Sequence, residues 1–248
     1  MSGDAVVDEE MSLTEHLEDL RRVLIIAGGS WFAVALLLFV VLRHQLLAVV
    51  IAPINGVLAH GGHLIRTTVV TSITETLTIP LEVCAVAAFA LTLPVILWQV
   101  WSFVSPGLRP VERRFAGPFM ASALVLFAVG AAFAYFIMPV GLTFLANFLG
   151  SDVTFLPDLG SYLSFFLILV LVFGVAFELP VVVVLLALLG IVSSRSLRQR
   201  RKAILFGIIL ASLVITPGGD PFTPTALAIP LIVLFEASVL VVDKVLKR

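Results

Sequence analysis

The chain has 248 residues, of which 60% are hydrophobic and 12% are charged, and its formal net charge is −1. Soluble domains carry roughly 45–50% apolar and about 25% charged residues, so this composition, with a mean hydropathy of +1.17, excludes an ordinary soluble domain and predicts a membrane protein. The only cysteine is Cys84, which excludes an internal disulfide.

Six apolar segments follow one another along the chain, and each is predicted to be a membrane-spanning helix. A span of about 30 Å needs roughly 20 residues, a length that the first four segments reach and the last two do not. We expect the last two to cross where the bilayer is locally thinned, and a re-entrant hairpin is the alternative. The sequence thus predicts a single all-α, polytopic membrane domain over residues 1–248, with segments at 23–42, 77–104, 118–140, 162–192, 203–215 and 224–242.

The basic residues predict the orientation. Thirteen of the fifteen Lys and Arg residues flank the segments on one side, and only Arg43 and Arg66 lie on the other. The positive-inside rule therefore places both termini in the cytoplasm. Within residues 1–22, SLTEHLEDL has leucines at helical spacing, which predicts a short amphipathic segment at the cytoplasmic interface.

Two acids have both a structural and a functional interpretation. Glu112 stands beside Arg113 in the loop SPGLRPVERRFAG, where it either pairs locally or accepts a guanidinium group in a bidentate manner. Glu178 lies within a long apolar run, and an acid at a helix centre costs about 2.5–3.5 kcal/mol in lipid, so we expect it to face protein or water. It is either a protonated acid bonded to a neighbouring helix or a functional group, and Gly174 and Pro180 predict a bend beside it.

Other chemistry has little support in the sequence. His60 and His63 lie in the Gly-containing stretch AHGGHL, without a nearby acid or cysteine, so we expect no metal site there. We find no catalytic constellation and no Gly-rich phosphate loop. We therefore expect no enzymatic activity, no cofactor and no nucleic-acid partner.

Four stretches together resemble the TatC subunit of the twin-arginine protein translocase. They are SLTEHLEDLRRV, FVSPGLRPVERR, SYLSFFLILVLVFGVAFELPVVVVLLALLGI and ITPGGDPFTPTALAIPLIVLFE, and the resemblance extends from about Ser12 to the end of the sixth segment. It implies six helices, the last two short, bent and cupped around a concave face in the cell (inner) membrane. It also implies export of folded proteins driven by the proton-motive force, in a complex of several copies with single-span TatA and TatB subunits.

The resemblance also assigns roles to individual residues. Glu112 and Asp19 match the acids that receive the twin arginines of a signal peptide at the cytoplasmic face, although the family usually has glutamate where this chain has Asp19. The same signal-peptide-binding site includes Arg21, Phe103 and Arg113.

Two further acids match family positions away from that site. Glu178 matches a buried glutamate of the fourth helix, which the resemblance places in the concave groove toward a partner helix. Asp220 matches an acid in the outer turn.

A rival interpretation is an ion-coupled secondary transporter that uses Glu178 as a proton or ion site at the membrane midplane. No inverted repeat and no partner charge at matching depth supports it. A membrane scaffold without transport activity is a third interpretation, and binding of a twin-arginine peptide separates all three.

Overall fold

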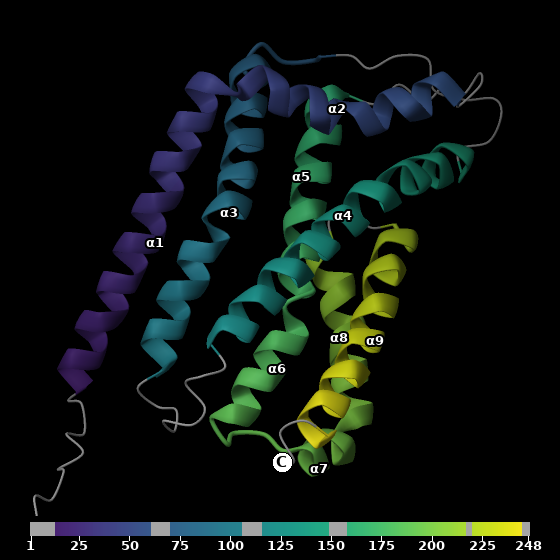
Figure 1. The fold of residues 1–248 in the computed structure, drawn as a ribbon. Helices are drawn as coiled ribbons and strands as arrows, with labels where there is room; N and C mark the ends of the chain where they lie inside the picture. The colour runs from purple at the N-terminus through teal and green to yellow at the C-terminus, as the bar shows by residue number, and fades with distance from the viewer. Residues whose placement is uncertain (1–12, 61–69, 106–115, 149–157, 217–219, 245–248) are drawn as a thin grey trace, which may run out of the picture.

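The computed structural model describes residues 13–60, 70–105, 116–148, 158–216 and 220–244, which are shown in Figure 1. These residues form helices and no β-sheet, and five stretches are long and apolar enough to cross a membrane. The helices are α1 Leu13–Val41, α2 Arg43–His60, α3 Glu75–Val104, α4 Ala116–Phe148, α5 Leu159–Ala176, α6 Leu179–Leu188, α7 Ser194–Gln199, α8 Arg201–Ile215 and α9 Phe222–Lys244. The all-helical, multi-pass class predicted from composition is confirmed.

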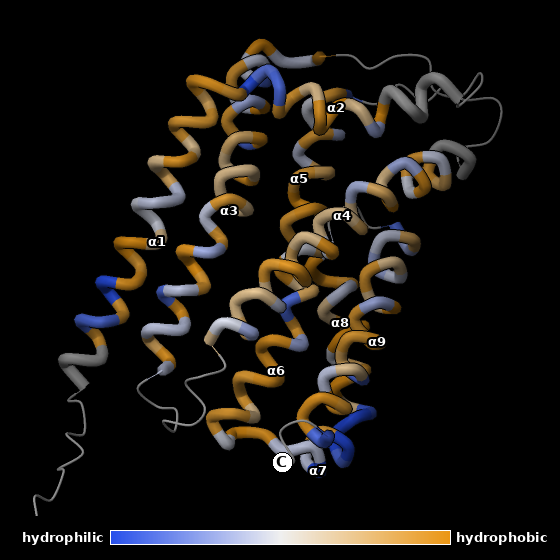
Figure 2. Tube along the Cα trace, in the orientation of Figure 1, coloured by the Kyte–Doolittle hydropathy of each residue, from blue (hydrophilic) through white to orange (hydrophobic). Residues whose placement is uncertain are grey.

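The long helices run between two ends of the molecule. α1, α3, α4 and the α5–α6 pair alternate in direction, so the start of α1, the short helix α7 and the end of α9 lie at the same end (Figure 1). Strongly hydrophilic colour marks α7 and the first turns of α1 at this end, and also the start of α2 at the other end (Figure 2). We call the end with α7 the basic end, because five Lys and Arg residues lie between positions 195 and 202, from α7 to the first turn of α8.

The helices at the last two predicted segments differ in length. α8 has 15 residues, or about 22 Å of helix, and does not reach the length of a full span. α9 has 23 residues and extends past the predicted segment at both ends, so it is one of the five stretches long enough to cross.

Helix α2 was not among the predicted elements. It lies across the ends of α3 and α5 opposite the basic end (Figure 1) and packs against α3 and α4. Ile54 on α2 is fully buried, and the hydroxyl of Tyr135 on α4 donates a hydrogen bond to the carbonyl of Val49 at 3.2 Å. Its apolar run is shorter than a membrane span and contains Pro53, so apolar length did not predict this helix.

The α4–α5 crossing lies close to the centre of the main hydrophobic cluster. A Cβ atom on Gly130 would lie 2.5 Å from the carbonyl oxygen of Phe173, and one on Gly174 would lie 2.6 Å from the Phe127 ring. Both positions therefore need glycine, because the backbones approach as closely as small residues allow between membrane helices. This contact fixes the end of α5 and the residues that follow it.

The predicted fourth segment is interrupted at the expected place. α5 ends at Ala176, Phe177 and Glu178 form a turn, and α6 begins at Leu179. Pro180 has no N–H to donate to the carbonyl of Ala176, so the α-helical ladder cannot continue through this point. The bend predicted from Gly174 and Pro180 is thus a break between two helices, and Glu178 lies in it.

Candidate functional site

A polar pocket lies between the first turns of α1 and the last turns of α3, at the left of the basic end in Figure 1. Its volume is about 230 Å³. The two helices run side by side in opposite directions, so residues far apart in sequence meet at their ends. The pocket is lined by Asp19, Arg22, Val23 and Ile26 from α1, and by Trp98, Gln99, Ser102 and Phe103 from α3.

The lining can bind a cationic ligand with an apolar neighbour. Asp19 supplies a partly exposed carboxylate, while Gln99 and Ser102 supply neutral acceptor oxygens. A carboxylate accepts two parallel N–H bonds from a guanidinium group, which makes arginine a fitting partner. Val23 and Ile26 form an apolar wall, and Arg22 places a positive charge in the same lining.

The structure brings together two of the predicted signal-peptide residues. Asp19 and Phe103 line one pocket, whereas Arg21 is exposed and does not line it. Glu112 and Arg113 lie outside the described residues, so their positions relative to the pocket stay predictions.

Sequence reasoning missed four of the polar and aromatic lining residues, Arg22, Trp98, Gln99 and Ser102. Helical spacing was the available signal, because positions 19, 22, 23 and 26 share one face of α1, and 98, 99, 102 and 103 share one face of α3. Spacing alone does not say which helix that face will meet.

Glu178 is enclosed at the break between α5 and α6. Both of its carboxylate oxygens are buried and have no hydrogen-bond partner among the described residues. Its side chain does not cap α6, although its backbone carbonyl accepts the N–H of Val182 at 3.0 Å. A buried polar group without a partner is unfavourable, so this carboxyl lowers the stability of the isolated chain.

Asp220 lies two residues before the first residue of α9. Its carboxylate accepts the backbone N–H of Thr223 at 2.7 Å and the hydroxyl of the same residue at 2.9 Å, and its side chain is buried. This is an N-cap, in which a short acid satisfies a free N–H of the first helical turn. The predicted outer-turn acid thus has a clear structural task.

A second acidic cap stands at the start of α5. Asp158 accepts the Ser161 N–H at 2.8 Å and the Thr71 hydroxyl at 2.9 Å, which ties the segment before α3 to the start of α5. The Ser161 N–H, followed by the hydrogen bonds from the Ser161 and Thr71 side chains, lowers the pKa of Asp158 below its usual value. Asp158 is therefore ionised at neutral pH.

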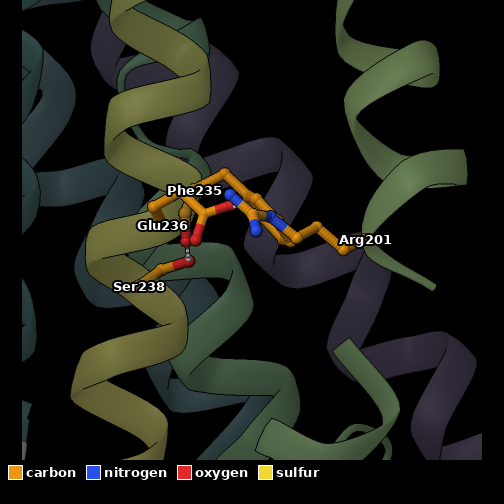
Figure 3. Close-up of polar contacts among 4 residues, drawn as sticks. All are labelled: Arg201, Phe235, Glu236 and Ser238. Carbon is orange, nitrogen blue, oxygen red and sulfur yellow. Dashed lines mark hydrogen bonds and ion pairs between the residues drawn. The ribbon is translucent and has the colours of Figure 1, made fainter. Parts of the chain in front are cut away.

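Two ion pairs join the basic end of α7 and α8 to α9. Arg201 Nε lies 2.6 Å from Glu236 Oε1 (Figure 3), and Arg198 Nη2 lies 2.7 Å from Asp243 Oδ2. Beside Glu236 on the same helix, the Ser238 hydroxyl donates to the carbonyl of Phe235 three residues earlier, so this polar side chain is satisfied within α9 (Figure 3). Sequence analysis overlooked Glu236, whose signal was an acid inside a predicted apolar segment.

The apolar helices that alternate in direction, with a polar pocket at one end, define a multi-pass helical membrane protein. The model of the Sec-independent protein translocase protein (TatC) family matches residues 15–230. The chain therefore belongs to the TatC family.

Individual relatives agree along nearly the whole chain. The Sec-independent protein translocase protein TatC of Azotobacter chroococcum mcd 1 is 38% identical over 236 residues, which cover 94% of this chain and 89% of the relative. The protein of the same name from Escherichia coli (strain K12) is 38% identical over 234 residues, which cover 94% of this chain and 88% of the relative.

Two crystal structures have a similar fold. Each is described as the twin arginine translocase receptor TatC, and each superposes with a TM-score of 0.79. One is 32% identical, covers 94% of this chain and is itself fully covered. The other, solved in the detergent DDM, is 31% identical and covers 92% of this chain and 99% of its own.

Proposed function

We propose that this chain is the core receptor component of a twin-arginine translocase. It binds twin-arginine signal peptides at the cytoplasmic face and helps to export folded proteins, driven by the proton-motive force. Its task is recognition and transport, with no catalytic step assigned to it. The single observation that carries the proposal is the pocket in which Asp19 and Phe103 meet between α1 and α3.

The orientation follows from charge. The basic end is the cytoplasmic end, which places both termini in the cytoplasm and the pocket on the side where precursors arrive. α8 is the fifth of six spans, and the membrane is thinned around its 15 residues. The cell (inner) membrane is the compartment that this orientation implies.

The signal-peptide site has two acids and a supporting frame. Asp19 receives one guanidinium group from the pocket, and Glu112 receives the other from the loop between α3 and α4. Arg21 and Arg113 brace these acids, and Phe103 shapes the wall. The chain works in several copies with TatA-type and TatB-type single-span subunits, and Glu178 contacts a polar group of such a helix during assembly or transport.

Peptide affinity tests the recognition site. Asp19→Asn and Glu112→Gln keep the shape of the side chain and remove its charge. Losing a charge-assisted hydrogen bond costs about 1.5–3 kcal/mol, so each variant should bind a twin-arginine peptide roughly 10- to 100-fold more weakly. Glu18→Gln is the matched control, because Glu18 is exposed on α1 beside Asp19 and does not line the pocket.

The peptide itself supplies a second control. A peptide with both arginines changed to lysine should bind the unmodified protein poorly, because lysine cannot form the bidentate fork. Unchanged affinity in both Asp19→Asn and Glu112→Gln would show that the peptide binds elsewhere on the protein.

A further inference from the structure

The segment between α6 and α8 has more basic side chains than ion pairs within the described part of the chain. Five of the eight residues at positions 195–202 are Lys or Arg, and all five are exposed. Arg198 and Arg201 are held by Asp243 and Glu236 of α9. Arg195, Arg200 and Lys202 form no ion pair within the described part of the chain, so a net positive charge remains at this edge.

The segment is fixed in place. Ser193 caps α7 by accepting the Ser196 N–H at 3.2 Å, and Ser194 and Leu197 are buried beneath the basic residues. Together with the two ion pairs to α9, these contacts fix the backbone that carries Arg195, Arg200 and Lys202. Residues 195–202, which we call the basic edge, therefore form an ordered surface.

Helix α8 continues from this edge as two faces of different character. One face packs inward, with Ile208 6% exposed and Ser212 1% exposed. A second, exposed face has Lys202, Phe206, Ile209 and Leu213 at i, i+4, i+7 and i+11, and the three apolar side chains are 66%, 44% and 57% exposed. In a membrane helix, this stripe faces lipid acyl chains directly below an exposed cation.

We propose that this stripe is a binding site for an anionic glycerophospholipid. Lys202 and the neighbouring Arg200 contact the phosphate diester, and an acyl chain lies along Phe206, Ile209 and Leu213. Basic residues at the cytoplasmic boundary of a membrane helix attract anionic headgroups. A zwitterionic headgroup carries its own cation, so it gains less from this edge.

The site has a structural reason. α8 is about 22 Å long, which is shorter than the hydrocarbon core is thick. The bilayer must therefore be thinner around α8, which brings lipid headgroups to the level at which the helix begins. A bound anionic lipid would hold the membrane boundary at Lys202. Its phosphate would also supply a negative partner for basic residues that form no ion pair with α9. A purely topological role for the basic residues predicts no such preference, because it depends only on the number of charges during insertion.

Titration of phosphatidylglycerol into the delipidated full-length protein in a neutral detergent, read by native mass spectrometry, tests the site. Phosphatidylcholine with the same acyl chains is the reference lipid. Each basic side chain near the surface contributes about fivefold, and the two share one phosphate, so the double variant R200Q/K202Q should bind phosphatidylglycerol roughly 5- to 25-fold more weakly. K244Q is the matched control, because Lys244 is an exposed cation at the same end on α9.

Two more variants separate the headgroup from the acyl chain. K202R keeps the charge and should retain binding, which also shows that the position tolerates substitution. F206S should weaken both lipids, because it removes apolar contact without changing charge. Inorganic phosphate at equal concentration should not displace the lipid, since it lacks the chain.

Three results would overturn the assignment. They are equal affinity for the two lipids in the unmodified protein, an equal loss in K244Q and R200Q/K202Q, and displacement by inorganic phosphate alone. If R200Q/K202Q fails to fold, the other two variants take its place. Loss of the lipid preference in K202R, or unchanged binding of both lipids in F206S, would then overturn the assignment.

Discussion

Glu178 offers a prediction in which stability and function change in opposite directions. Its two carboxylate oxygens are buried without a partner among the described residues, and leaving such a group unsatisfied costs about 1–3 kcal/mol. Glu178→Met has similar length and no polar atom, and a volume-conserving swap usually costs less than about 1.5 kcal/mol in packing. We expect this variant to be more stable than the original protein by about 1 kcal/mol, the difference between the middle values of these two effects.

Thermal unfolding of the purified protein in detergent measures the effect. For a chain of this size, the expected gain corresponds to a rise in Tm of roughly 2–4 °C. Glu82→Met is the matched control, because Glu82 accepts the Ser164 hydroxyl at 2.7 Å between α3 and α5. Removing that acceptor should leave Tm unchanged or lower it.

The second measurement is export activity per molecule of correctly inserted protein. If Glu178 contacts a partner helix, Glu178→Met should export poorly despite its higher Tm, and Glu178→Gln should retain much activity because an amide still donates and accepts hydrogen bonds. If the carboxyl must pass a proton, Glu178→Gln should fail as Met does. A lower Tm in Glu178→Met would refute the structural reasoning, and normal export in it would leave the acid without a role in transport.

Local geometry supports three further predictions. Gly174→Ala should reduce stability by about 1–3 kcal/mol through overlap with the facing aromatic ring, whereas Gly207→Ala, which meets no atom within 4 Å, should be neutral or stabilising; detergent unfolding compares them. Asp220→Ala should reduce helix stability by about 1 kcal/mol and speed hydrogen exchange in the first turn of α9, and Asp220→Asn should largely preserve the cap. With the native cysteine replaced, Ile73→Cys should react with an impermeant thiol reagent from outside the cell and Gln199→Cys only after the membrane is opened; external labelling of Gln199→Cys would overturn the orientation.

The sequence was sufficient for the long helices because their apolar length is a strong signal. It also located the break at Glu178, since Pro180 cannot continue the hydrogen-bond ladder. It missed α2 because that helix is stabilised by contacts such as Ile54 against the core and the Tyr135 hydrogen bond to Val49, and these depend on neighbours far along the chain. Apolar length is the sequence signal of a membrane span, and α2 lacks it.

The pocket shows the same limit in a functional site. Asp19 and Phe103 were placed by the family resemblance, and spacing alone left Asp19 as part of a solvated face. Gln99 and Ser102 become site residues only when α3 is laid antiparallel to α1. Helical periodicity indicates which residues share a face, and only packing decides which two faces enclose a cavity.

The break at Glu178 and the close α4–α5 crossing act together. Gly130 lets Phe173 and Phe177 approach α4, which holds the end of α5, and Pro180 in the next turn prevents the helix from continuing. The buried carboxyl and the carbonyl of Ala176, which Pro180 cannot serve, therefore lie within one turn of each other in a long apolar segment. A polar side chain on a partner helix would gain more hydrogen-bond energy at this break than beside the hydrogen-bonded helical turns above or below it. In the proposed assembly, the geometry that makes Glu178 unfavourable in the isolated chain would be relieved where a partner helix reaches it.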